Sequence, residues 1–198
     1  RRSIKTCTYI IAPVMMSIAF CAEPLVRLIL TEKWLPCVLF LRVFCLGYAC
    51  WPIITANLNA AKAVGRSDLY LKCQLLNEGV CILLLLATFR VSVEAIAYGM
   101  LITNVVTQIL DAQLNKKLIG YGYLEQMRDI LPTLLLAAGA GLCMYLVIFL
   151  HLPDLLTVII QVVVGLGIYL TGSAILELDT FEYFKDVLAP SIRQKLKR

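Results

Sequence analysis

The stretch ILPTLLLAAGAGLCMYLVIFL, residues 130–150, is followed four residues later by LLTVIIQVVVGLGIYLTGSAIL, residues 155–176. Neither run contains a charged side chain. Each is long enough to cross the hydrocarbon core of a bilayer, because about 20 helical residues span about 30 Å. Pro153 and Asp154 interrupt the apolar character between them. The pair therefore predicts two antiparallel transmembrane helices joined by a short turn.

The rest of the 198-residue chain has the same character. Hydrophobic residues make up 61% of it, charged residues 16%, and the mean hydropathy is +0.85, far from the values of soluble domains. Lipid offers the backbone no hydrogen-bond partners, and the runs lack the alternation of barrel strands, so helices are required. We predict an all-α polytopic membrane protein, with a bundle of six transmembrane helices over residues 1–177. The expected spans are about 7–30, 38–61, 71–89, 93–113, 130–150 and 155–176.

The two ends of the chain lead to separate expectations. Arg1 and Arg2 precede the first apolar run directly, without an initiator Met or a cleavable signal, so we expect further chain upstream. After the last span, residues 178–198 place apolar side chains three or four apart among basic ones. This pattern predicts a cytoplasmic, amphipathic basic tail that lies at the membrane surface.

Basic residues set the orientation, because short cytoplasmic loops accumulate Lys and Arg. If both ends are cytoplasmic, all but four of the 18 Lys and Arg residues fall on the cytoplasmic side. The four exceptions are Arg27, Lys33, Arg42 and Arg90. The net charge of +5 thus reflects topology and attraction to anionic membrane lipids, and it gives no reason to expect nucleic-acid binding.

Reactive side chains give no catalytic pattern. The eight cysteines are scattered through apolar runs without a C-x-x-C pair, which favours small packing residues over a disulfide or metal site. His151 is expected in an interfacial loop. The chain has no Ser, His and Asp set, no phosphate-binding Gly-rich loop and no aspartate cluster. We therefore predict no catalytic residue, no metal, no cofactor and no enzymatic activity.

Two polar stripes mark the third and fourth spans at the helical spacing i, i+3, i+4 and i+7. They are Gln74, Asn77, Glu78 and Cys81 on the third span and Asn104, Thr107, Gln108 and Asp111 on the fourth. Both stripes fall in the cytoplasmic half, so they could line a shared cavity open to the cytoplasm. The alternative is that the amides only hydrogen-bond between packed helices. Thr55 and Asn59 on the second span are interpreted as packing residues.

Glu78 is the acid we single out. It lies about seven residues, or roughly 10 Å, into the third span, and acids within a membrane are usually functional. If coupling to a proton or sodium gradient runs through this lobe, Glu78 is the candidate to carry it. The competing interpretation is that it only bonds Asn77, Gln74 or a neighbouring helix.

Two arginines near the outer side form the remaining candidates. Arg27 follows Glu23 by four residues on the first span, and Arg42 enters the second span from the same side. A guanidinium matches phosphate oxygens, so either could bind a phosphate. The alternative, which we favour, pairs Arg27 with Glu23 and extends Arg42 to the membrane surface.

A family resemblance extends these expectations. Leu30-Thr31-Glu32-Lys33-Trp34-Leu35-Pro36, then Leu41-Arg42, then residues 57–68 ending in Ala63-Val64-Gly65-Arg66-Ser67-Asp68 resemble the second half of bacterial oligosaccharide flippases. These are the polysaccharide biosynthesis branch of the multidrug/oligosaccharidyl-lipid/polysaccharide exporter superfamily. The matching family elements are Gly-x-x-Trp, Leu-Arg and a Gly-Arg-x-Asp-like loop. Thr31 or Glu32 stands here in place of the first Gly.

The resemblance implies the carboxy-terminal lobe of a two-lobe flippase in the bacterial cytoplasmic membrane. The implied substrate is an oligosaccharide on an undecaprenyl pyrophosphate carrier, moved outward for cell-surface polysaccharide biosynthesis. The implied partner is an amino-terminal lobe, in the same chain or another. Without that lobe this chain could not enclose the substrate, so we expect no transport by it alone.

Two other functions remain open at this stage. One is a cation-coupled multidrug exporter of the same superfamily, although the basic loops favour an anionic, lipid-linked substrate. The other is a non-transporting membrane scaffold that recruits polysaccharide polymerase and glycosyltransferases. Whether the polar stripes are needed for export separates a scaffold from a carrier.

The charge distribution makes a testable prediction about topology. We expect residues 62–72 and 116–128 in the cytoplasm and residues 32–36 outside. Lys33→Cys and Lys117→Cys, each in a cysteine-free background, should differ toward an impermeant thiol reagent added to intact cells. Lys33→Cys should be labelled and Lys117→Cys should not. Labelling in the reverse pattern would show that the chain is inverted.

Overall fold

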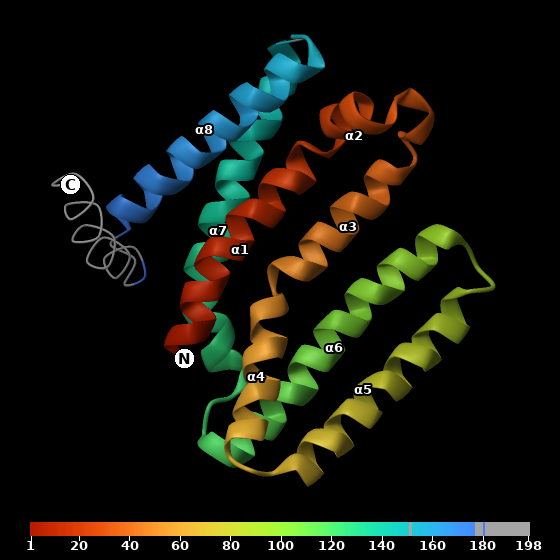
Figure 1. The fold of residues 1–198 in the computed structure, drawn as a ribbon, viewed down its shortest axis with the longest axis vertical. Helices are drawn as coiled ribbons and strands as arrows, with labels where there is room; N and C mark the ends of the chain where they lie inside the picture. Colours follow the sequence, from red (N-terminus) through yellow and green to blue (C-terminus); the bar gives the residue numbers. More distant parts are fainter. Residues whose placement is uncertain (151, 177–179, 181–198) are drawn as a thin grey trace, which may run out of the picture.

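The computed structural model describes residues 1–150, 152–176 and 180, and this part of the chain is helical without strands (Figure 1). The all-α prediction is confirmed. His151 and, apart from Thr180, the predicted tail at 178–198 lie outside the described residues. The elements are α1 (Arg2–Phe20), α2 (Ala22–Leu30), the 3₁₀ turn η1 (Glu32–Trp34), α3 (Cys37–Ala49), α4 (Trp51–Ala63), α5 (Ser67–Thr88), α6 (Val93–Ile119), α7 (Tyr123–Leu146), the 3₁₀ turn η2 (Val147–Leu150) and α8 (Asp154–Ile175).

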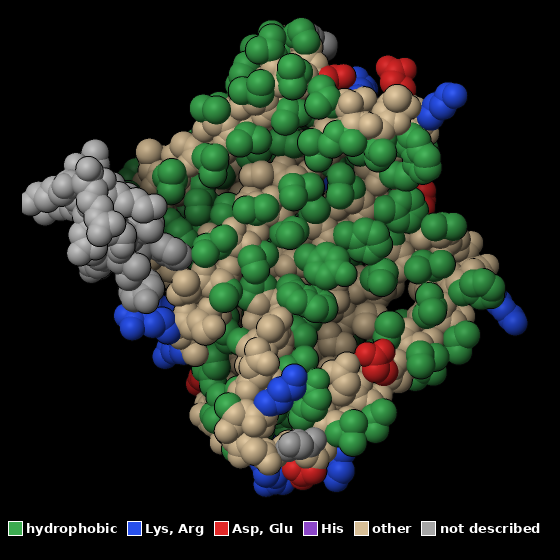
Figure 2. All heavy atoms as spheres, in the orientation of Figure 1, with side chains coloured by type: hydrophobic (Ala, Val, Ile, Leu, Met, Phe, Trp, Pro, Cys, Tyr) green, Lys and Arg blue, Asp and Glu red, His purple; other side chains and the backbone are tan. Residues whose placement is uncertain are grey.

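Five helices are long and apolar enough to cross a membrane: α1, α5, α6, α7 with η2, and α8. The bent pair α3 and α4 makes a sixth candidate span. Side chains on the outside fit this reading, since the exposed surface is rich in Leu, Ile, Val and Phe. Figure 2 shows hydrophobic side chains over the middle of one face, with most charged side chains toward its two ends. The protein is a multi-pass helical membrane protein.

The helices pack in the order α8, α7, α1, α3 with α4, α6 and α5 (Figure 1). Each contacts the next in this order. The order places α5 at one edge, where it packs mainly on α6 and touches α4. Asn77 is the only residue of α5 whose described side chain is buried. Contacts with α6 and α4 therefore hold α5 in place.

The first predicted span is two helices, because the chain breaks at Cys21 between α1 and α2. Pro24 has no N–H to give the Phe20 carbonyl one turn earlier, which ends the hydrogen-bonding ladder there. The Ala19 carbonyl at this break accepts a hydrogen bond from Arg42 Nε at 3.3 Å. A side chain thus satisfies a backbone group that lipid could not.

The second predicted span also breaks, at Cys50, where α3 and α4 meet at a bend of 41°. Pro52 stands at the start of α4 and cannot donate to the Tyr48 carbonyl. The bend turns α4 away from the line of α3 (Figure 1). It thereby directs the polar residues of α4 toward α5 and α6.

A polar cluster fixes the start of α1 against α7. Asp129 on α7 accepts from Arg1 Nη2 at 2.7 Å and from the Tyr121 hydroxyl at 2.8 Å. Lys5 adds a longer ion pair to the same carboxylate, at 3.7 Å. Burial, and then the Asp129 carboxylate beside it, raise the pKa of Tyr121. Tyr121 therefore stays a neutral hydrogen-bond donor.

Thr31, between α2 and η1, adopts an unusual backbone conformation. Its φ of 77° and ψ of 165° lie in a region that is almost restricted to glycine. It is the only described non-glycine residue with a positive φ. Its position matches the resemblance noted above, in which a glycine is expected at Thr31 or Glu32. The chain therefore pays a backbone cost to make this turn.

Thr31→Gly is expected to stabilise the fold. A residue in this region costs about 1–3 kcal/mol, and the extra freedom of glycine in the unfolded chain offsets part of the gain. We expect the free energy of unfolding in detergent to rise by about 1 kcal/mol. Glu32→Gly, one residue later at an ordinary φ, is the control and should not stabilise. Equal behaviour of the two variants would show that Thr31 is unstrained.

Candidate functional site

The whole α5 stripe and the first half of the α6 stripe, Asn104 and Thr107, line one cavity of about 430 Å³ between α4, α5 and α6. Figure 2 shows hollows in the lower half of the visible face, the region where these helices lie in Figure 1. Its polar lining consists of Gln74, Asn77 and Glu78 from α5, Thr103, Asn104 and Thr107 from α6, and Thr55, Asn59 and Lys62 from α4. The structure thus places Thr55 and Asn59 in a cavity wall, beyond the packing role expected of them.

Aromatic rings complete the cavity. Trp51 and Tyr70 line it from α4 and α5, and Lys62 Nζ lies 4.6 Å from the centre of the Tyr70 ring. The sequence analysis missed all three residues. Tyr70 could have been found, because it precedes Gln74 by one turn on the same stripe. Trp51 could not, since its direction depends on the bend at Pro52.

Glu78 lies on the exposed side of this cavity wall. Its Oε1 accepts a hydrogen bond from Gln74 Nε2 at 3.0 Å, one turn earlier on the same helix. This contact is the local bond that the competing interpretation of Glu78 described. An exposed carboxylate in a polar cavity can contact a solute directly, and it does not bridge two helices among the described residues.

Asp111 is the buried acid. Its side chain is on α6, the residue is 1% exposed, and Oδ1 accepts from Asn77 Nδ2 at 2.9 Å and from Cys73 Sγ at 3.2 Å. Asp111 Oδ2 and Asn77 Oδ1 are buried and have no hydrogen-bond partner among the described residues. Gln108, one turn before Asp111, is also buried and does not line the cavity.

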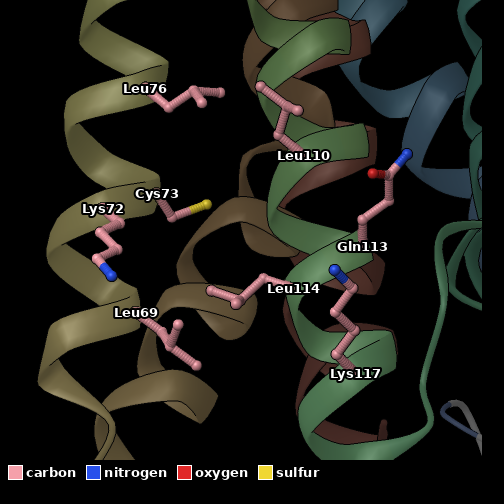
Figure 3. A pocket seen from close by; sticks show the side chains of 8 residues that line it. All are labelled: Leu69, Lys72, Cys73, Leu76, Leu110, Gln113, Leu114 and Lys117. Atoms are coloured by element: carbon pink, nitrogen blue, oxygen red, sulfur yellow. The ribbon is translucent and has the colours of Figure 1, made fainter.

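A second hollow lies on the other side of α5, between α5 and α6, with a volume of about 230 Å³. Figure 3 shows its leucines facing one another from the two helices, while the Lys72 side chain lies over α5 and the Lys117 side chain lies over α6. Leu69, Leu76, Leu110 and Leu114 form the apolar walls. The sequence analysis missed this groove, because neither lysine lies on a polar stripe. Two ammonium groups beside an apolar groove suit an anion that carries a hydrocarbon chain.

The two candidate arginines lie apart from this site. Arg27 pairs with Glu23 at 2.8 Å, as the favoured alternative expected. Arg42 does not extend to the surface, because it donates to the Ala19 carbonyl and lines a separate, mostly apolar hollow of about 310 Å³. Both guanidinium groups thus have partners within the protein.

Metal binding finds no support in the described part of the chain. It contains no group of three or more His, Cys, Asp or Glu side chains placed to hold an ion. All eight cysteines are free thiols.

Residues 1–39 match a family model described as polysaccharide biosynthesis protein. The matched segment covers α1, α2, η1 and the start of α3, and it includes the strained turn at Thr31. No curated protein and no solved structure matches the chain. This short match and the apolar helices fit a polysaccharide-related membrane protein.

An amide cluster beside the cavity explains how α4 is held. Asn57 Nδ2 donates to Gln126 Oε1 at 3.0 Å, and Asn57 Oδ1 accepts from Asn115 at 2.6 Å and from Gln126 at 2.9 Å. The three residues belong to α4, α6 and α7 and are all nearly fully buried. Asn57 lies two residues from both Thr55 and Asn59, so on a helix it turns away from the face that they share. That same turn directs Asn57 into the bundle.

Asn57→Ala should therefore destabilise the protein where Asn59→Ala does not. The alanine leaves the buried Asn115 amide without its acceptor and Gln126 Oε1 without its donor, which costs about 2 kcal/mol. Asn59 faces the open cavity and serves as the matched control on the same helix. Unfolding midpoints in detergent would measure both. A loss as large in Asn59→Ala would mean that the cavity wall, and not the amide cluster, holds α4.

Proposed function

We propose that this chain is one lobe of a flippase that moves lipid-linked oligosaccharide across the bacterial cytoplasmic membrane. The observation that carries the proposal is the cavity between α4, α5 and α6. Amides, hydroxyls and a carboxylate line it together with the rings of Trp51 and Tyr70. Sugar hydroxyls need many donors and acceptors, and the apolar faces of sugar rings pack on aromatic side chains. The polysaccharide biosynthesis match over residues 1–39 supports the same substrate class.

Lys72 and Lys117 offer a binding place for the polyprenyl pyrophosphate part of this substrate. The groove on the other side of α5 combines two ammonium groups with leucine walls. A polyprenyl pyrophosphate carries both charge and hydrocarbon, so it suits this groove as a free sugar or a neutral drug would not. This chemistry favours the lipid-linked substrate over the multidrug alternative.

The mechanism that this architecture permits is alternating access. A second lobe of similar size would close the open side of the cavity, with substrate bound between the lobes near the midplane. On the orientation expected from the basic loops, the cavity lies in the cytoplasmic half, where the substrate would enter. The protein then acts as a carrier and not as an enzyme. A scaffold that recruits polysaccharide-synthesis enzymes would have no need of this polar interior.

Tryptophan fluorescence tests the proposal, because the two tryptophans lie at different places. Trp51 lines the cavity, whereas Trp34 is exposed on η1. Trp34→Phe leaves Trp51 as the single reporter. In nanodiscs, titration with undecaprenyl-pyrophosphate-linked oligosaccharide should change its emission with saturation, and undecaprenyl phosphate should change it less.

Trp51→Phe is the matched control, with Trp34 as its single reporter. Its emission should be unchanged over the same titration. A response confined to Trp34, or an equal response to carrier lipid with and without sugar, would reject the cavity as the sugar site.

A further inference from the structure

Asp111 differs from the other acids of the described chain because it is buried without an ion-pair partner. Asp129 also has a largely buried side chain, but it pairs with Arg1. Asn77 and Cys73 each donate one hydrogen bond to Asp111, and both bonds end on the same oxygen, Oδ1. Oδ2 has no partner among the described residues. A carboxylate held in this way keeps its negative charge without compensation, which is costly in a buried site.

Asp111 and Asn77 each have a buried oxygen without a hydrogen-bond partner among the described residues. Asn77 donates to Asp111, yet its own Oδ1 is buried without a partner, as is Asp111 Oδ2. Both atoms are acceptors, so neither can satisfy the other. A proton on Asp111 removes the uncompensated charge and turns Oδ2 from an unpartnered acceptor into a possible donor.

No basic side chain forms an ion pair with Asp111 in the described part of the chain, and this includes Lys72 and Lys117 of the neighbouring groove. Cys73 is the titratable group that contacts Asp111 from α5. The helices α3, α4 and α7 also pack on α6, and none of their charged residues in the described chain forms an ion pair with Asp111. On α3, Arg42 bonds the Ala19 carbonyl, and on α4, Lys62 lies over the Tyr70 ring.

A metal cation fits the pair poorly. Mg²⁺ and Ca²⁺ take six or more oxygen ligands, whereas the pair offers two unpartnered oxygens, one each from Asp111 and Asn77. A proton needs only one acceptor and leaves the two observed donors in place. It is the ligand that the arrangement fits.

The same carboxyl holds a cavity wall. Among the described residues, every hydrogen bond from an α5 side chain to another helix ends on Asp111. Its two donors face different hollows, since Asn77 lines the polar cavity and Cys73 lines the groove that contains Lys72 and Lys117. Asp111 therefore lies between the two hollows, where the edge helix α5 contacts α6.

We propose that Asp111 is a proton-loading site, and that its proton holds α5 against α6 and so sets the shape of the cavity. With the proton bound, the pair is neutral and keeps the two hydrogen bonds that Asp111 Oδ1 accepts. When the proton leaves, the buried charge favours separation of α5 from α6 and entry of water. Only such a difference in proton affinity between two shapes lets a proton drive a change between them. The link to transport rests on the proposed function, but the proton on Asp111 does not.

Infrared spectroscopy of the whole chain in nanodiscs tests the site itself. At neutral pH the wild type should show the carbonyl band of a protonated carboxyl, with the intensity of one group among the 13 Asp and Glu residues. The band should disappear as pH rises. Asp111→Asn, which is neutral and of the same shape, should lack it, and Asp111→Ser provides a second variant should the first fail to fold.

Glu78→Gln is the matched control, because Glu78 is the other acid among the polar stripes and lines the cavity. It should keep the band. Persistence of the band in the Asp111 variants, its loss in Glu78→Gln, or its absence from the folded wild type would each overturn the proposal.

A second measurement separates the proton site from the transport role. In the Trp34→Phe background, affinity for undecaprenyl-pyrophosphate-linked oligosaccharide should change by about tenfold as pH rises through the Asp111 titration, a typical size for coupled sites. Asp111→Asn should remove this pH dependence. An infrared band on Asp111 with no sugar binding would reject the proposed function and leave the proton site standing. Sugar binding that stays equally pH-dependent in Asp111→Asn would reject the coupling.

Discussion

This structure depends on one requirement, which is that backbone groups must form within the protein the hydrogen bonds that lipid cannot supply. Every N–H and C=O group at membrane depth must find its partner within the protein, which enforces helices. Where a helix ends inside the bundle, the freed carbonyl needs a side chain, and Arg42 supplies one at the end of α1. An arginine that looks on the sequence like a phosphate ligand is thus committed to the backbone. The break at Cys21 and the position of Arg42 are two sides of one requirement.

The sequence predicts the helical class well, because length and hydropathy decide it, but it does not predict where spans break. Four prolines lie within helices of the described chain, and their effects differ. Pro13 and Pro132 lie inside α1 and α7, which continue through them, whereas α2 and α4 begin just before Pro24 and Pro52. A proline removes one hydrogen bond in every case. Whether the helix then ends depends on which neighbouring helices pack on either side, and that is tertiary information.

The candidate site shows the same division. Helical spacing identifies the faces of α5 and α6 that meet, so the sequence alone groups Gln74, Asn77, Glu78 and Asn104. Spacing cannot tell which of the two acids, Glu78 or Asp111, is buried. Glu78 is adjacent to Asn77, yet one successive residue turns a helix by about 100°, which takes Glu78 into the open cavity and Asn77 onto Asp111. Which of the two residues is buried depends on how α5 packs on α6 and α4, and the bend between α3 and α4 sets the direction of α4.

The 41° bend also divides the second span into parts with separate tasks. On one side of Cys50, α3 packs on α1 and α2 and belongs to the framework of the bundle. On the other side, α4 presents Trp51, Thr55 and Asn59 to the cavity. Changes in these exposed cavity positions leave the framework contacts of α3 untouched, so the lining of the cavity could vary along one half-helix at little cost to folding. In a straight span, the residues that line the cavity and those that stabilise the bundle would lie on one continuous helix.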